Sequence, residues 1–482
     1  MNATQPQSIQ ALMDASGVRF GTSGARGLAA DMTAPVCFAY SAAFLRVVGA
    51  PAAGRVALGM DLRPSSPAIA GACAEAIRAA GLEVDFCGVL PTPALAFYAQ
   101  QQGIPAIMVT GSHIPFDRNG IKFYRAEGEI TKADEAGIAG ATVAVPLGLA
   151  PAPLPALNPA AAEMYLARYR DFFPAHVLAG MRLGFYEHSS VARDLLRELL
   201  EALGARVTSL GRTDQFVPID TEAVSPEDAA RARAWSAEFG FDALLSTDGD
   251  ADRPLIGDER GEWLRGDVVG ILTAQSLGAR AVATPVSSNT ALEKCGAFDA
   301  IARTRIGSPY VIAGMEQLAA AGAEQVVGFE ANGGFLVGNA IEQSGRSLAP
   351  LPTRDAVLPI LALLALAREQ GVPLSALAAG LPRRFTASDR LQNFATEASR
   401  ALIGALAGSA EALAAFLAPL GREAAALDET DGLRITLADG DILHLRPSGN
   451  APELRCYAEA DSQDKANALA RAGLARVRSS QA

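Results

Sequence analysis

The chain has 482 residues, of which 50% are hydrophobic and 19% are charged. This composition excludes an intrinsically disordered chain, and the length, at roughly 150 residues per domain, predicts about three domains rather than a small scaffold. Acidic residues outnumber basic ones by 52 to 41, and the net charge of −11 argues against nucleic acid and anionic membranes as partners. An anionic substrate would therefore have to meet a local basic pocket.

The cysteines and the apolar segments indicate where the protein works. The five cysteines are scattered without a Cys-x-x-Cys pair, so the sequence predicts neither a disulfide framework nor a zinc site and favours the reducing cytoplasm. The N-terminus lacks the basic and apolar regions of a secretory signal. The longest apolar run, Ala356–Ala367, is shorter than the roughly 20 residues that span a bilayer, and we predict a buried helix there.

Three short β-rich runs stand in the first part of the chain, at 56–61, 83–88 and 106–112. Helical patterns separate them, and this alternation builds a sheet with crossover helices. A proline-rich stretch without periodicity follows at 145–158 and is typical of a linker. We therefore predict a first α/β domain over residues 1–152.

The same alternation of strand-like runs and helical patterns starts again near residue 181 and a third time near Trp263. It predicts a second α/β domain over residues 153–260 and a third over residues 261–378. Three such units in tandem suggest an internal triplication. In each unit a polar, glycine-containing stretch follows the carboxyl end of a strand, where open α/β sheets bind ligands.

The pattern changes after Pro382. An alanine-rich helical stretch is followed by strand-like runs that turn at Asp439–Asp441 and by a closing helix, which predicts a smaller α+β domain over residues 379–482. The expected fold class is thus α/β, with three tandem related domains that contain mixed or parallel sheets, plus an α+β C-terminal domain.

Three aspartates, Asp248, Asp250 and Asp252, follow the apolar run ALLST directly, and Arg253 comes next. Carboxylates at alternate positions of a bent loop can converge on one hard divalent cation such as Mg²⁺, and the adjacent arginine suits a phosphoryl group. An exposed acidic turn is the simpler alternative. An EF-hand loop does not fit, because Arg253 stands where the sharp turn of that loop requires glycine.

A second candidate loop contains Ser112 and His113 and is followed by Lys122. A hydrolase nucleophile is one interpretation, but Gly-x-Ser-x-Gly is absent and adjacent side chains seldom face one another as nucleophile and base. Alternatively, Ser112 carries a phosphoryl group while Lys122 serves as a cation or proton shuttle. A serine that only caps a turn is the structural alternative.

Three further segments could bind parts of an anionic ligand. The glycine-rich stretch 20–27 supplies Arg26 and backbone amides that can approach a phosphate. Glu330 and Asn332 follow a strand and could bind sugar hydroxyls, or form an ordinary polar turn. A C-terminal stretch could hold a phosphate through guanidinium groups and loop donors, or be an exposed hairpin turn; its residues are Arg446, Ser448, Gly449, Asn450 and Arg455. Of the histidines, we expect His176 and His444 to be structural and His188 to line a pocket.

Taken in order, FGTSGARG, TGSHIP with NGIK, DGDADR, GFEANGG and RPSGNAPELR resemble the motifs of the α-D-phosphohexomutase superfamily. The resemblance spans nearly the whole chain and implies four domains around a central cleft. It implies that Ser112 is the phosphoserine, that the three aspartates bind Mg²⁺ together with its phosphoryl oxygen, and that Lys122 is the general acid/base beside Arg26. It also implies that Glu330 contacts sugar hydroxyls and that the 446–455 stretch holds the phosphate that is not transferred.

The implied reaction moves a phosphoryl group between O1 and O6 of a hexose phosphate, through a hexose 1,6-bisphosphate that also serves as activator. The forms that two motifs take in this chain, FGTSGARG and EANGG, favour phosphomannomutase activity. Phosphoglucomutase activity or dual specificity is the alternative, and phosphoglucosamine mutase activity is less favoured. Two other functional classes stay open: a non-catalytic protein that binds phosphosugars, and a metal-dependent phosphatase. We expect a monomer or a homodimer.

The sequence also departs from the family pattern at several positions. Gly111 stands where alanine usually precedes the serine, Asn332 and Gly334 replace the serine and histidine of the sugar loop, and Ser308 replaces a frequent histidine. Asn450 stands where threonine is usual. These differences bear on which hexose is preferred. We further expect Arg26, Lys122, Arg253, Arg446 and Arg455 to converge around the substrate.

Overall fold

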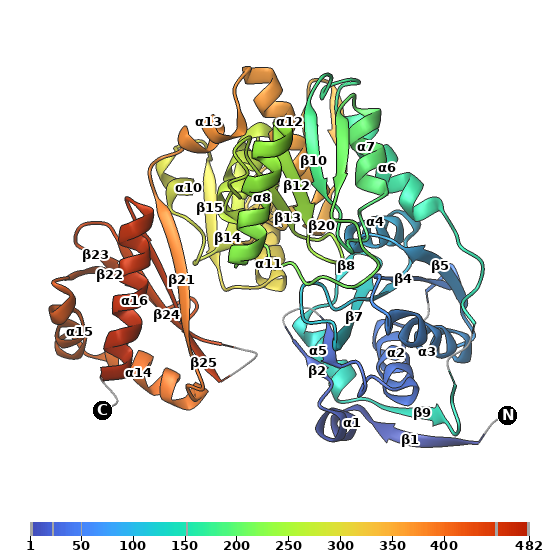
Figure 1. Cartoon of the computed structure of the whole chain (residues 1–482). Coiled ribbons are helices and arrows are strands. Elements are labelled where there is room, and N and C mark those ends of the chain that lie inside the picture. The colour runs from blue at the N-terminus through green and yellow to red at the C-terminus, as the bar shows by residue number, and fades with distance from the viewer. Residues whose placement is uncertain (1–2, 22–23, 50, 151–152, 449–451, 480–482) are drawn as a thin grey trace.

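The computed structural model describes residues 3–21, 24–49, 51–150, 153–448 and 452–479. Its elements form an arch, with the sheet of the N-terminal region at one end, the C-terminal sheet at the other, and two further sheets between them (Figure 1). The predicted fold class is confirmed: three α/β sheets with helices on their faces precede an antiparallel sheet packed against helices.

The first large sheet has the order β2-β3-β7-β6-β4-β5, and β8 pairs with the outer part of β7. Its centre is parallel and its β7 side is antiparallel. A separate antiparallel pair joins the N-terminal strand β1 to β9. The strands are β1 (Thr4–Ser8), β2 (Arg19–Phe20), β3 (Ala25–Leu28), β4 (Arg55–Met60), β5 (Glu83–Val89), β6 (Ala106–Val109), β7 (Arg118–Arg125), β8 (Gly128–Glu129) and β9 (Thr142–Pro146), and the helices are α1 (Ile9–Ser16), α2 (Ala34–Val48), α3 (Ser66–Ala79), α4 (Thr92–Gln102) and α5 (Lys132–Ala139).

The second sheet has the order β11-β10-β12-β13. Its helices obey local rules: α8, for example, begins at Ser225, whose hydroxyl accepts from the backbone N–H of Asp228, and ends at Gly240 in the left-handed region. The elements are α6 (Ala160–Phe172), β10 (Arg182–Tyr186), α7 (Leu195–Ala202), β11 (Arg206–Leu210), α8 (Pro226–Phe239), β12 (Ala243–Thr247) and β13 (Pro254–Gly257).

The third sheet has the order β15-β14-β16-β17-β20, and a small hairpin of β18 and β19 lies beside it in the chain. The elements are α9 (Gly266–Ser276), β14 (Ala281–Pro285), α10 (Ala291–Lys294), β15 (Ala300–Thr304), α11 (Ser308–Ala320), β16 (Val326–Phe329), β17 (Phe335–Val337), β18 (Ile341–Gln343), β19 (Arg346–Leu348), β20 (Leu351–Asp355), α12 (Val357–Gln370) and α13 (Leu374–Ala379). The helix predicted at Ala356–Ala367 is confirmed as α12, most of whose apolar side chains are buried.

One topology occurs three times. In each of the first three sheets a first strand pairs in parallel with the second and third strands, and the third pairs antiparallel with a fourth; these sets are β4-β5-β6-β7, β10-β11-β12-β13 and β14-β15-β16-β17. The loop from the third to the fourth strand carries Ser112 in the first set, Asp248 to Asp252 in the second and Glu330 in the third. The three candidate loops are therefore topologically equivalent, which supports the expected triplication.

The C-terminal sheet is antiparallel throughout, in the order β21-β25-β24-β23-β22. The predicted turn at Asp439–Asp441 is confirmed between β23 and β24. No single described helix is long and apolar enough to span a membrane, although α14 and α15 together reach the length, with a 108° bend between them. The elements are β21 (Phe385–Gln392), α14 (Thr396–Gly408), α15 (Ala410–Leu417), β22 (Ala424–Asp428), β23 (Leu433–Leu437), β24 (Ile442–Pro447), β25 (Glu453–Ala460) and α16 (Gln463–Ser479).

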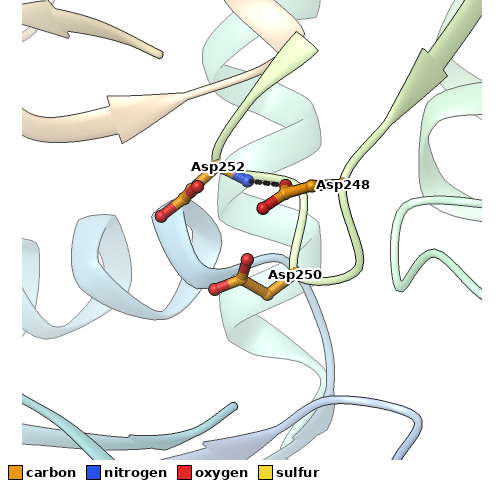
Figure 2. Close-up of side chains that lie close together, drawn as sticks. All are labelled: Asp248, Asp250 and Asp252. Carbon is orange, nitrogen blue, oxygen red and sulfur yellow. Dashed lines mark hydrogen bonds between the residues drawn. The ribbon is translucent and has the colours of Figure 1, made fainter. Parts of the chain in front are cut away.

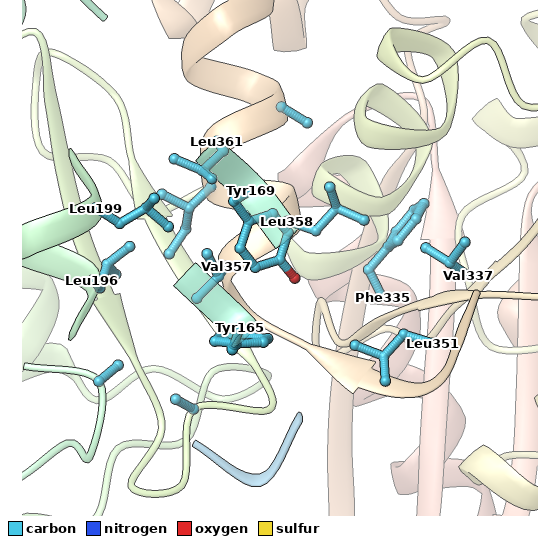
Figure 3. Close-up of a cluster of buried hydrophobic side chains, with 14 of the residues drawn as sticks. Tyr165, Tyr169, Leu196, Leu199, Phe335, Val337, Leu351, Val357, Leu358 and Leu361 are labelled. Carbon is cyan, nitrogen blue, oxygen red and sulfur yellow. The ribbon is translucent and has the colours of Figure 1, made fainter. Parts of the chain in front are cut away.

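The second and third sheets share one hydrophobic core, which also takes in α4 from the first region. Figure 3 shows its centre, where side chains of α6, α7 and α12 meet those of β17 and β20. Within it the hydroxyls of Tyr165 and Tyr169 both donate to the buried carboxylate of Asp355, which ends β20. This shared core holds β20 and the sugar loop in place relative to the aspartate loop.

Parts of two motifs from the sequence analysis lie in strands. In the described part of the stretch 20–27, Phe20 ends β2, Gly24 has φ 75°, and residues 25–27 lie in β3; Lys122 lies inside β7. β3 has only four residues, and in β7 the apolar residues Ile121 and Phe123 are too few among polar neighbours to form a long alternating pattern, so the sequence did not single out either strand.

We predict that Tyr165→Phe lowers the melting temperature measurably, because the buried Asp355 carboxylate loses a donor 2.6 Å away. The cost of an unsatisfied buried polar group is about 1–3 kcal/mol. Thermal unfolding followed by circular dichroism tests this, with Tyr310→Phe, at a half-buried position, as the control. Equal melting curves for the Tyr165 variant and the wild type would contradict the assigned contact.

Candidate active site

The three predicted aspartates lie together in the loop between β12 and β13. One carboxylate oxygen from each of Asp248, Asp250 and Asp252 lies within 4.8 Å of the others, and all three side chains are buried. Figure 2 shows the carboxylates on the same side of the loop, which turns sharply so that the backbone N–H of Asp252 donates to Asp248. The alternative of an exposed acidic turn is therefore wrong.

Asp250 and Asp252 each use one carboxylate oxygen for contacts within the protein. Oδ2 of Asp250 accepts from Thr92 Oγ1 at 2.6 Å and from Lys122 Nζ at 2.7 Å. Oδ2 of Asp252 accepts from the same Nζ at 2.7 Å and from Arg354 Nη2 at 2.8 Å. Oδ1 of each is buried without a hydrogen-bond partner in the described part of the chain. Although neither oxygen accepts a hydrogen bond within the described residues, Oδ1 of Asp252 lies 3.5 Å from Arg253 Nε, and buried carboxylate oxygens in this arrangement fit a divalent cation.

Asp248 differs from the other two aspartates. Its Oδ1 accepts from two backbone N–H groups, and its Oδ2 accepts from Ser112 Oγ at 2.6 Å. Burial raises the pKa of its carboxyl well above the usual range, and the charges of Asp250 and Asp252 add to this. A bound cation would offset that repulsion and hold all three carboxylates ionised.

Ser112 is fully buried and lies at φ 51°, in the left-handed region that non-glycine residues rarely adopt. This conformation turns His113 back, so that its Nδ1 lies 3.2 Å from Ser112 Oγ. The expectation that adjacent serine and histidine side chains do not meet is therefore wrong here. Because the hydroxyl proton goes to Asp248, Nδ1 is the donor in the contact with His113. The loops pack closely: a Cβ on Gly249 would lie 2.8 Å from the carbonyl oxygen of Ser112.

Arg63, which no sequence motif indicated, shapes the serine loop. Its guanidinium is fully buried and donates to four backbone carbonyls of that loop, at distances of 2.6 to 3.0 Å. It also pairs with Asp61 at 3.2 Å. A Cβ on Gly111 would lie 2.5 Å from Cζ of Arg63, so glycine at 111 is what lets the guanidinium reach these carbonyls.

The basic residues near Ser112 differ in their electrostatics. Burial pulls down the pKa of Lys122, but Asp250 and Asp252 outweigh it, and the net pKa is raised. Burial, followed by the charge of Arg253, lowers the pKa of Arg26 to about 10. The charge of Arg253, followed by burial, lowers the pKa of His113 to about 2, so this imidazole is neutral near pH 7. Of the five basic residues predicted to converge, Lys122, Arg26 and Arg253 thus lie near one another, whereas Arg446 and Arg455 lie in the last sheet.

The predicted sugar loop lies against the aspartate loop. Glu330 is buried and its Oε2 accepts from Arg354 Nη1 at 2.9 Å. Oδ1 of Asn332 accepts from the backbone N–H of Gly334 at 2.9 Å, and its carbonyl oxygen accepts from Thr221 at 2.8 Å. The Asn332 amide therefore closes the turn of the loop, and only its Nδ2 is available as a donor to a ligand.

The two C-terminal arginines lie opposite each other on adjacent strands of the last sheet. Arg446 in β24 is in register with Arg455 in β25, and Arg446 Nε donates to Asp431 at 2.8 Å. Glu222, from the second region, is influenced by the charges of both Arg253 and Arg455, which connects this sheet electrostatically with the aspartate loop. A cavity of about 240 Å³ lies there and is lined by Asp220, Glu222, Ala223, Ser388, Asp389, Arg390, Arg455 and Tyr457.

The loop predicted to hold a phosphate is described only in part. Ser448 is buried, and its backbone N–H donates to the carbonyl of Glu453 at 2.8 Å, which closes the β24–β25 hairpin. Gly449 and Asn450 lie outside the described residues. In Figure 1 the ends of β24 and β25 point toward the first sheet, the sheet that carries Ser112.

Two polar residues in the site had no motif around them, Thr92 and Arg354. Thr92 begins α4, and Arg354 is next to the last residue of β20. The run LPTRD, which places an arginine and an aspartate at the carboxyl end of an apolar stretch, was the available signal for Arg354. Ser308, at the position of a frequent family histidine, donates to Glu129 at 2.8 Å.

The remaining histidines do not belong to the site. His188 is buried and contacts the carbonyl of Thr247 at 2.9 Å, so it stabilises the strand end rather than lining a pocket as predicted. His444 is also buried and contacts the carbonyl of Asp431, which agrees with a structural role. His176 is exposed.

Comparison with known proteins assigns most of the chain. Residues 17–145 match the model of phosphoglucomutase/phosphomannomutase α/β/α domain I, residues 265–385 match domain III, and residues 392–474 match the C-terminal domain of the same family. The matched segments include the serine loop, the sugar loop and the last sheet.

Two curated relatives match nearly the full length. A phosphomannomutase of Salmonella muenchen is 47% identical over 97% of this chain and 97% of its own. A phosphomannomutase of Sinorhizobium fredii is 45% identical over 96% of this chain and 99% of its own. Among solved structures, a putative phosphomannomutase from Thermus thermophilus superimposes with a TM-score of 0.74 over 96% of this chain and 99% of its own, at 21% identity, which shows a common fold.

The aspartate loop predicts cation binding that can be measured without substrate. We expect Asp250→Asn and Asp252→Asn each to raise the dissociation constant for Mn²⁺ at least about 10-fold, because each removes a charge from a three-carboxylate site. Isothermal titration calorimetry with Mn²⁺ measures this. Asp214→Asn makes the same charge change at a side chain that is 96% exposed, and it should bind as the wild type does. Unchanged affinity in the loop variants would refute the site.

The buried histidines predict a loss of stability in acid. Burial lowers the pKa of both His188 and His444 to about 4, below the ordinary value near 6.5. The folded state therefore binds fewer protons than the unfolded chain between about pH 6.5 and 4, so stability present above pH 6.5 is lost as the pH falls. We expect His444→Gln to flatten the decline in melting temperature from pH 7 to 4.5, whereas the exposed His176→Gln keeps the wild-type slope.

Proposed function

Because the chain belongs to the phosphoglucomutase/phosphomannomutase family of α-D-phosphohexomutases, we propose that it is a phosphomannomutase, an isomerase that interconverts mannose 6-phosphate and mannose 1-phosphate. Two relatives that share nearly half of its residues are phosphomannomutases, and the match covers nearly their whole length. Glucose phosphates are the alternative substrate, alone or beside mannose phosphates, since Gly334 and Asn332 give the sugar loop an unusual composition.

One observation carries the proposal: the buried Ser112 hydroxyl lies 2.6 Å from Asp248, inside a ring of three aspartates and one lysine. A protein that only binds phosphosugars does not require a buried hydroxyl held against such a cluster. A phosphoryl group on Ser112 would extend into the space that the orphaned oxygens of Asp250 and Asp252 face.

In the proposed cycle the P–O bond of phospho-Ser112 breaks as the phosphoryl group passes to the free hydroxyl of the bound hexose phosphate. As the sugar hydroxyl attacks, Lys122 gives a proton to the leaving Ser112 Oγ and takes one from the sugar hydroxyl, so the products are the free serine hydroxyl and the hexose 1,6-bisphosphate. After this intermediate reorients, Ser112 takes back the other phosphoryl group. Mg²⁺ bound by Asp248, Asp250 and Asp252 would neutralise charge on the transferring group.

The basic side chains are proposed to share the handling of charge and protons. Lys122, kept protonated by two carboxylates, is suited to donate a proton or to stabilise the transferring group. His113 is neutral and its Nδ1–H donates to Ser112 Oγ, so it would hold the serine oxygen in place and stabilise the charge that develops on it as the phosphoryl group leaves. Arg26 and Arg253 add positive charge beside the phosphoryl group, and phosphoryl transfer depends mainly on such positioning and neutralisation.

The substrate is proposed to bridge the sheets. Glu330 would accept from sugar hydroxyls, and the C-terminal stretch with Arg446, Ser448 and Arg455 would hold the phosphate that is not being transferred. Asn332 is proposed to contact the sugar together with Glu330, and Gly449 and Asn450 are proposed to hold the phosphate together with the arginines. Bridging of this kind requires the last sheet to approach the first, which would exclude water from the phosphoserine.

Several wider features also belong to the proposal. Boundaries at residues 152, 260 and 378 would separate four domains, each with one of the large sheets. Hexose 1,6-bisphosphate would serve as activator by phosphorylating Ser112. The five cysteines are all free thiols, which suits a cytoplasmic enzyme, and we propose a monomer or homodimer.

The decisive test replaces the proposed phosphoryl carrier. We expect Ser112→Ala to lower turnover of mannose 1-phosphate, with Mg²⁺ and glucose 1,6-bisphosphate present, by at least about 10³-fold, and to remove the phosphoryl adduct from the intact mass. Ser409→Ala, which removes the hydroxyl that caps α15, should keep full activity. Release of free phosphate by the wild type in place of the isomer would indicate a phosphatase and overturn the assignment.

A further inference from the structure

Arg354 joins two of the three equivalent loops. Its Nε and Nη2 donate to Oδ2 of Asp252 at 3.2 and 2.8 Å, and its Nη1 donates to Oε2 of Glu330 at 2.9 Å. The side chain is only 3% exposed. A planar guanidinium can serve two carboxylates on different edges at once, which a lysine ammonium on a flexible stem does less well.

The sugar loop is shaped to admit this arginine. A Cβ on Gly334 would lie 2.5 Å from Cδ and 2.7 Å from Cγ of Arg354. Gly334 is not among the glycines with positive φ, so its backbone conformation would accept alanine. Glycine is needed at 334 because the stem of Arg354 crosses over it.

The neighbours of Arg354 fix its position from both sides. Thr353 donates to Glu129 of the first sheet at 2.7 Å, and Asp355 accepts from Tyr165 of α6 at 2.6 Å. Three consecutive residues at the end of β20 therefore contact the first sheet, the aspartate and sugar loops, and the shared core. The guanidinium is held in place before any ligand binds.

We propose that Arg354 is a positioning residue that couples the cation site to the sugar site. By holding Oδ2 of Asp252 it leaves Oδ1 directed toward the cation, and by holding Oε2 of Glu330 it leaves Oε1 for a sugar hydroxyl. The second half of this inference rests on the proposed function, which supplies the sugar as the ligand of Glu330; the first half does not.

Two substitutions test the coupling directly. We expect Arg354→Met and Arg354→Lys each to raise the Mn²⁺ dissociation constant about 10-fold, as is typical when a residue that orients a metal ligand is lost, and to raise KM for mannose 1-phosphate by more than they lower kcat. The Mn²⁺ titration does not depend on activity. If the wild type proves inactive on hexose phosphates, the proposed function fails while the effect on Mn²⁺ still reports on Arg354 and Asp252.

Gly334 provides a second test that separates positioning from general damage. We expect Gly334→Ala alone to weaken Mn²⁺ binding and raise KM much as the Arg354 variants do, because its methyl group displaces the arginine. In an Arg354→Ala background the same methyl group has room, so the second substitution should change neither quantity more than about 2-fold. Gly404→Ala, where a Cβ meets nothing within 4 Å, should match the wild type.

Each result of these measurements either supports or overturns the coupling by Arg354. Non-additive effects in the double variant support the coupling. Effects that multiply, or Arg354 variants with wild-type Mn²⁺ affinity and KM, would overturn it. Melting temperatures of all variants within a few degrees of the wild type ensure that the changes concern the site rather than the fold.

Discussion

Burial of three carboxylates at one point is the constraint on which the rest of the site depends. Ionised aspartates removed from water repel one another and lose hydration, so each must meet positive charge or hydrogen-bond donors. In this protein the donors come from far along the chain: Lys122 from β7, Thr92 from α4 and Arg354 from β20. The aspartate loop can therefore adopt its conformation only when the first three sheets are assembled, and this requirement ties folding to the formation of the site.

The repeated topology explains how these distant segments meet. Each of the first three sheets places a loop after its third strand, at the carboxyl end of a parallel pair, and the three loops carry a serine, a cluster of aspartates and a glutamate. The same strand topology thus presents the three side-chain sets to which we assign the phosphoryl carrier, the cation site and the sugar contact. Three equivalent loops that carry different side chains can contact different parts of one ligand at the carboxyl ends of the sheets.

Two departures from the family pattern have a common physical cause. Gly111 and Gly334 stand where relatives commonly carry side chains, and in each case an added Cβ would lie 2.5 Å from a buried arginine, Arg63 or Arg354. One arginine organises the carbonyls of the serine loop and the other links two carboxylates. In both loops, therefore, the absence of a side chain at the glycine makes room for the buried arginine that supports the loop.

The sequence by itself determined the alternation of strands and helices, the buried helix α12 and the identity of the serine and aspartate loops, because these features depend on local periodicity and on residues a few positions apart. It did not reveal β3, which is short, or β7, in which few apolar residues stand among polar ones; both strands are stabilised by pairing with their neighbours. Only the tertiary structure decided which residues complete the site. Arg63, Thr92 and Arg354 have no motif around them, since their hydrogen bonds go to carbonyls and carboxylates that lie between 24 and 158 residues away along the chain and become neighbours only after the sheets pack.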